Sequence, residues 1–78
     1  MKSNPYYKQC ILRRFNVVEF AWIPRQFASG GKHVDILDRN SGEWSTWQVD
    51  KVYSTVLSHE ELQAKSQQYK DTRKTSDI

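Results

Sequence analysis

Turn-forming residues divide most of this chain into short segments, and this division limits what the chain can fold into. A reversal is expected around Asn16, and Pro24 lacks the N–H that a strand ladder needs. Gly30 and Gly31 interrupt the chain again, and residues 38–42 form the clearest turn. The segments between these points alternate apolar and polar residues, which is the period of a β-strand. The sequence therefore predicts a β-rich body.

Four strands are predicted, at residues 6–13, 17–23, 33–37 and 43–53. In the second strand, Phe20 and Trp22 share one face, and both are expected in the core. In the fourth, Val52 breaks the alternation that precedes it. A β-bulge is therefore predicted near Asp50 and Lys51.

One helix is predicted after the strands. Ser58 and Glu61 have the spacing of a capping box, in which each side chain bonds the backbone N–H of the other. The helix is expected to run from His59 to Arg73. Its apolar stripe is narrow, because only Leu62 and Tyr69 share a face two turns apart.

These elements predict an α+β fold with a small, strongly bent antiparallel sheet. The sheet is expected to be an SH3-like barrel or a four-stranded meander, with the helix at its C-terminal end. Residues 1–57 would form the body, and residues 58–78 the helix and a basic arm. Only 37% of the 78 residues are hydrophobic, so the core depends on aromatic rings, each of which buries about 150–250 Å².

The sequence offers little for catalysis. A single cysteine, Cys10, excludes an intrachain disulfide, and its mid-strand position suits a small buried side chain better than a nucleophile. His33 and His59 lie far apart, so no metal site is expected. Gly30 and Gly31 lack the pattern of a phosphate-binding loop. We expect a protein that is not an enzyme and uses no cofactor.

Charge and hydropathy bear on location and partners. No apolar run is long enough to span a membrane, and the N-terminal residues lead into no signal peptide. A cytoplasmic protein without a membrane partner is expected. Basic residues dominate both ends of the chain and acidic residues its middle. That asymmetry is typical of nucleic-acid or acidic-protein partners, or of ends that fold over the middle.

Five short motifs are spread over most of the chain. They are Tyr7-Lys8-Gln9-Cys10, Trp22-Ile23-Pro24, Phe27-Ala28 with Gly31-Lys32, Trp47-x-Val49, and Tyr69-Lys70-x-Thr72-Arg73-Lys74-x-Ser76-Asp77-Ile78. In these motifs the chain resembles a group of small, uncharacterised proteins of tailed bacteriophages. The resemblance implies a phage gene product in the cytoplasm of a bacterial host. It implies no activity, although small phage proteins often bind a host or defence protein.

Binding is therefore the favoured function, with a bacterial protein as the expected partner. Protein interfaces favour Trp, Tyr and Arg as anchors. The basic C-terminal segment would be a docking arm or a solvated helix face. The candidate residues are Trp44, Tyr53, Tyr69, Lys70, Arg73 and Lys74.

The alternative is a nucleic-acid-binding module built on the N-terminal hairpin. Small barrels can stack bases on exposed aromatic rings beside basic residues that contact phosphates. The candidate residues are Tyr7, Lys8, Arg13, Arg14 and Arg25. This alternative requires the three arginines to share one surface.

Overall fold

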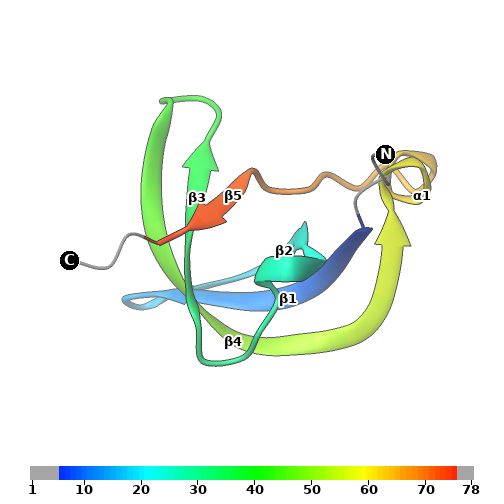
Figure 1. Cartoon of the computed structure of the whole chain (residues 1–78). Coiled ribbons are helices and arrows are strands. Elements are labelled where there is room, and N and C mark those ends of the chain that lie inside the picture. The colour runs from blue at the N-terminus through cyan, green and yellow to red at the C-terminus, as the bar shows by residue number, and fades with distance from the viewer. Residues whose placement is uncertain (1–5, 76–78) are drawn as a thin grey trace.

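The structure is a computed structural model that describes residues 6–75. Its elements are β1 (Tyr6–Arg14), β2 (Val17–Pro24), a 3-10 turn η1 (Arg25–Phe27), β3 (His33–Asp38), β4 (Glu43–Ser58), α1 (His59–Ala64) and β5 (Thr72–Lys74). Outside the described residues lie 1–5 and 76–78, and the second of these ranges is the end of the C-terminal motif. The strands form one antiparallel sheet in the order β2-β1-β4-β3-β5 (Figure 1). The α+β class and the small antiparallel sheet are thus confirmed, with five strands instead of the four that were predicted.

β4 is the strand that bends the sheet. It is 16 residues long, and one half pairs with β1 while the other half pairs with β3. Ile11 lies opposite Lys51 but Leu12 lies opposite Val49, so Asp50 is an extra residue in the ladder. This is the predicted bulge. A second shift follows further along β4. Extra residues bend and twist a strand, and β4 curves strongly in Figure 1. The sheet stays open, with β2 and β5 as its edges.

The core consists of two clusters on opposite sides of β1 and β2. The larger contains Cys10, Leu12, Ala21, Ile23, Val34, Ile36 and Val49. The smaller contains Tyr7, Trp22, Leu57 and Leu62, with Tyr69 packed against it. Three successive residues of β2, Ala21 to Ile23, are buried, so both faces of the strand are covered there.

Phe20 departs from the expected core. Trp22 is buried as predicted, but the Phe20 residue is 63% exposed although it shares Trp22's face of β2. The smaller cluster, which includes Leu62 of α1, covers this face at Trp22 and does not include Phe20. Strand alternation correctly assigns Phe20 to a face, but it does not show how far along the strand that face is covered.

The predicted start of α1 is confirmed. The Glu61 N–H donates to Ser58 Oγ at 3.2 Å, and the Ser58 N–H donates to Glu61 Oε1 at 2.9 Å. Both halves of the capping box are therefore present.

The predicted end of the helix, at Arg73, is wrong, because α1 stops at Ala64. Ser66 has a φ of 57°, in the left-handed region. The Gln67 N–H donates to the Leu62 carbonyl, and the Ser66 N–H donates to that of Gln63. Together these bonds form a Schellman motif, which satisfies the last carbonyls and reverses the chain.

Beyond α1 the chain crosses from one edge of the sheet to the other (Figure 1). The Lys70 N–H donates to the Trp22 carbonyl on β2 at 2.8 Å. The Leu37 N–H on β3 then donates to the Asp71 carbonyl at 3.0 Å, and β5 pairs with β3. Residues 69–73 were predicted to be helical, and they instead lie extended against β2 and β3 because their backbone groups bond to those strands.

Candidate functional site

Arg73 and Trp44, two of the predicted protein-binding residues, do lie together. The Arg73 guanidinium carbon lies 4.1 Å from the centre of the Trp44 ring, a cation–π contact. Arg73 Nε also donates to Asp35 Oδ2 at 3.1 Å. Arg73 therefore fastens β5 to β3 and β4, while its side chain remains 53% exposed.

Asp35 is the centre of this contact. The hydroxyls of Thr46 and Thr75 donate to Asp35 Oδ1 at 2.8 and 3.2 Å. Burial would raise the pKa of Asp35, but the hydrogen bonds from Thr46, Arg73 and Thr75 hold it below its ordinary value of 3.8. The carboxylate is therefore charged at neutral pH, and it joins three strands or their ends.

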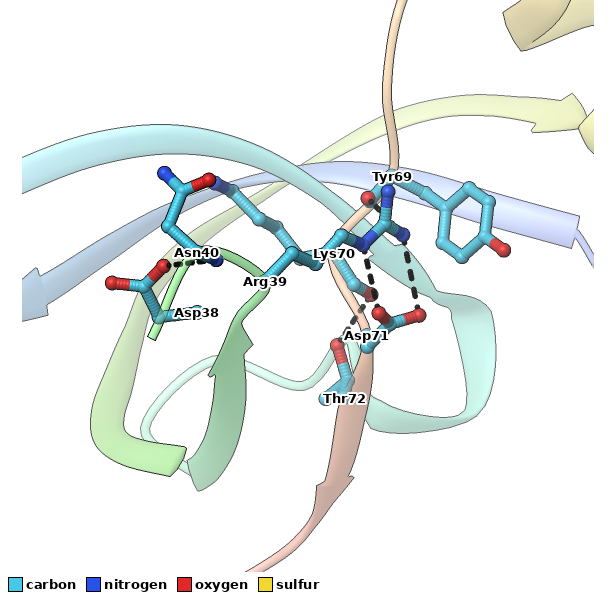
Figure 2. Close-up of polar contacts among 7 residues, drawn as sticks. All are labelled: Asp38, Arg39, Asn40, Tyr69, Lys70, Asp71 and Thr72. Carbon is cyan, nitrogen blue, oxygen red and sulfur yellow. Dashed lines mark hydrogen bonds and ion pairs between the residues drawn. The ribbon is translucent and has the colours of Figure 1, made fainter. Parts of the chain in front are cut away.

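Arg39, which was not among the predicted site residues, holds the crossing segment, residues 65–71 between α1 and β5. Its Nε and Nη2 donate to Asp71 Oδ2 and Oδ1 at 2.8 and 3.3 Å. Nη2 also donates to the Tyr69 carbonyl at 3.3 Å. Figure 2 shows the guanidinium facing the Asp71 carboxylate, with the Tyr69 ring beside it. The hydrogen bond that Arg39 donates to Asp71 raises the pKa of Arg39 further above its already high value. A lone Arg in a turn gives no sequence signal for this role.

Tyr69 and Tyr53 lie in different parts of the molecule. The Tyr69 ring stacks on the buried Tyr7 ring, with centres 4.8 Å apart, and is half-buried. Tyr53 is half-buried on the half of β4 that runs beside β1, whereas Trp44 lies on the half that pairs with β3. Lys70 and Lys74 are exposed. The predicted protein-binding residues therefore do not form one surface.

The residues of the nucleic-acid alternative are also dispersed. Arg13 and Arg14 are neighbours on β1 and so point to opposite faces, and Arg13 forms an ion pair with Asp50 at 2.6 Å. Arg25 follows β2 at the other end of the hairpin. Tyr7 is only 4% exposed and cannot stack a base, and Lys8 is half-buried. The alternative loses its main support.

An exposed apolar surface lies on β1, β2 and β4, and we call it the hairpin face. Val18 is 51% exposed and Phe20 63% exposed. Ile11 lies opposite Phe20 in the ladder, and the Tyr53 ring stacks beside the Phe20 ring at 6.2 Å. The hairpin face comprises Ile11, Val18, Phe20 and Tyr53. Of these, only Tyr53 was predicted to bind, because the alternation of β2 predicts that Phe20 lies in the core.

A cleft of about 490 Å³ lies on the other side of β2. Buried Leu12 and Ile36 contribute to its lining with Trp47. Glu19 of β2 and Lys70 are also among its lining residues. The exposed end of β2 thus separates an apolar face from a partly polar cleft.

Reactive groups do not converge in the part of the chain that the structure describes. Residues 6–75 contain no cluster of three or more His, Cys, Asp or Glu side chains that could hold a metal. Burial raises the pKa of the Cys10 thiol to about 11, and nearby Lys8 offsets this only in part. The thiol is therefore neutral and poorly nucleophilic at neutral pH. No helix among the described residues has the length and hydropathy to cross a membrane.

Comparisons with protein-family models, with curated proteins and with solved structures find no match to this chain.

Proposed function

We propose that this protein acts by binding another protein, with the hairpin face as the contact surface. The observation that carries the proposal is the exposure of Phe20 and Val18 beside half-buried Ile11 and Tyr53. Fully burying a Phe or Val side chain is worth about 1.5–3 kcal/mol. Contiguous exposed apolar side chains are typical of interaction sites on small soluble domains. A partner that covers this face would recover that free energy.

The surroundings of the hairpin face suit a protein interface. Lys51 Nζ lies 5.1 Å from the centre of the Tyr53 ring, and Arg13 lies opposite Val18 in the ladder between β1 and β2. Apolar and aromatic residues with a basic rim are common at protein interfaces, where Tyr and Arg are frequent anchors.

The resemblance to small phage proteins supports a bacterial partner. The protein would then be a phage-encoded accessory protein in the host cytoplasm that binds a host or defence protein stoichiometrically and modulates it. Trp44 with Arg73 is the competing contact surface. It is less favourable, because Arg73 already contacts Asp35 and covers part of the Trp44 ring.

Affinity capture from bacterial lysate, with and without nuclease, tests the proposal. A protein that binds the hairpin face directly should be recovered equally in both samples. Loss of every partner on nuclease treatment would mean that nucleic acid bridges the contact, and the protein-binding proposal would fail.

A further inference from the structure

The outer edge of β2 has backbone groups that point away from the sheet. Along an antiparallel strand, successive residues direct their N–H and C=O alternately toward the partner strand and away from it. The Trp22 carbonyl accepts a bond from the Lys70 N–H, so Trp22 is a residue whose groups point away from β1. Val18 and Phe20 share its alternation and point the same way.

Among the residues that the structure describes, only the Trp22 end of this edge is covered. Within the described residues, β1 is the only strand hydrogen-bonded to β2, and the crossing segment bridges β2 at Trp22. The chain itself thus shows that an extended segment can add to this edge. The next positions along it, Val18 and Phe20, have no strand from residues 6–75 opposite them on that side. Proteins usually protect such an edge with Pro or inward charges, because it can pair with another strand.

We propose that an extended segment of the partner protein pairs with β2 at Val18–Phe20 as an added strand. The proposal rests on the protein-binding function proposed above. Main-chain hydrogen bonds would supply affinity, and alternate side chains would supply specificity. One set of the partner's side chains would lie beside Phe20 on the hairpin face. The other set would lie on the cleft side, beside Glu19.

The charges on the cleft side indicate the chemistry of that segment. Glu19 is exposed, and neither it nor Asp38 forms an ion pair within the described residues. Arg39, at the same cleft, is paired with Asp71. Among the described residues that line the cleft, Lys70 is therefore the one basic group without an ion-pair partner. The cleft side therefore favours basic or apolar side chains, and the hairpin face favours apolar ones. The expected segment alternates apolar and basic residues.

A second copy of this chain fits the edge less well. Antiparallel pairing of β2 with itself, with Val18 opposite Phe20, places Glu19 opposite Glu19. Like charges directly opposite each other destabilise a sheet. In this register, which pairs both outward-pointing residues with the second copy, the charge of Glu19 favours a different protein as the occupant.

Selection of peptides from a random twelve-residue displayed library tests the proposal, with Val18→Pro as the discriminating variant. Proline lacks the N–H that Val18 points outward. Because that N–H does not bond to β1, the substitution breaks no hydrogen bond between β1 and β2. Val18→Thr is the matched control, because it changes the side chain and keeps the N–H. Peptides enriched on the native protein should alternate apolar and basic residues. Their dissociation constant for Val18→Pro should be about tenfold or more higher than for the native protein, and that for Val18→Thr should lie within about threefold of the native value.

Enriched peptides that bind Val18→Pro as tightly as the native protein would overturn the proposal. The proposal would also be overturned if the native protein enriched no peptides more strongly than Val18→Pro does. If that variant does not fold, amide exchange on the native protein decides: a bound peptide should slow exchange at Val18 and Phe20 by about tenfold or more. Unchanged exchange at both would refute strand addition.

Two further results separate the competing explanations. A dimer in sedimentation that Val18→Pro dissociates would assign the edge to a second copy and overturn the proposal. A lysate partner that binds Val18→Pro and the native protein equally would also overturn strand addition, while leaving the protein-binding function in place. Loss of all lysate partners with nuclease would instead refute the function itself.

Discussion

Asp35→Ala should destabilise the fold more than the loss of any other single carboxylate among the described residues. Asp35 accepts from Thr46, Arg73 and Thr75, and it is the only buried charged residue that the structure shows in residues 6–75. The substitution removes all of these contacts. It also removes the carboxylate that joins β5 to the sheet.

The magnitude follows from the exposure of each donor. Hydrogen bonds to a charged group contribute about 1.5–3 kcal/mol each. Thr46 is exposed and Thr75 half-buried, so water can satisfy their hydroxyls in the variant. Each of these two bonds is therefore worth the lower end of that range, about 1.5 kcal/mol. The Arg73 side chain is 53% exposed, and such an ion pair contributes about 0.2–1 kcal/mol. The expected loss is about 3–4 kcal/mol, from a total of about 4–12 kcal/mol for a chain of this size.

Urea unfolding followed by tryptophan fluorescence measures this loss. Asp50→Ala is the matched control, because it breaks the more exposed pair with Arg13 and should cost about 0–1 kcal/mol. The difference should also depend on pH. Because the folded pKa of Asp35 lies below 3.8, its stabilisation is present above 3.8 and is lost as the pH falls through the lower folded value. Equal losses for the two variants at neutral pH would refute the role assigned to Asp35.

Three other perturbations have defined outcomes. Ser58→Ala should lower the free energy of unfolding in urea by about 0.5–2 kcal/mol through loss of the cap, and an unchanged value would contradict the capping box. Cys10 should resist a thiol reagent at pH 7.5 until the chain unfolds. Because its folded pKa is raised to about 11 from 9.0, its stabilisation is complete below pH 9.0 and is lost as the pH rises through about 11. Arg39→Ala should speed amide exchange at Lys70, whose segment it holds, and leave exchange at Ala21 unchanged; equal acceleration at both amides would indicate general destabilisation instead.

Features that depend on neighbours in the sequence were predictable. The turn at residues 38–42 is confirmed: the Asn40 N–H donates to Asp38 Oδ1, and Gly42 has a φ of 77°. The bulge at Asp50 and the start of the helix at Ser58 are confirmed for the same reason. Each rests on residue types whose spacing determines the local backbone.

Features that depend on distant contacts were not predictable. Ser66 ends the helix in a left-handed conformation without the Gly that usually signals it. Arg73 meets Asp35 across 38 residues, so its place in a strand had no local sign. Phe20 lies on the face that alternation assigned to it, but coverage of that face depends on where α1 and the crossing segment come to lie. The hairpin face was therefore missed.

The central claim is that the protein binds a partner through the hairpin face. The most direct test uses a partner protein that is still captured after nuclease treatment and is then purified. Isothermal titration measures its binding to the native protein, to Phe20→Ser and to Trp44→Ser. Both side chains are exposed, so neither change should unfold the protein. We predict that Phe20→Ser weakens the dissociation constant about thirtyfold, as for an interface hot spot worth about 2 kcal/mol, and that Trp44→Ser changes it less than about threefold. A large loss with Trp44→Ser and none with Phe20→Ser would contradict the claim and assign binding to the surface around Arg73.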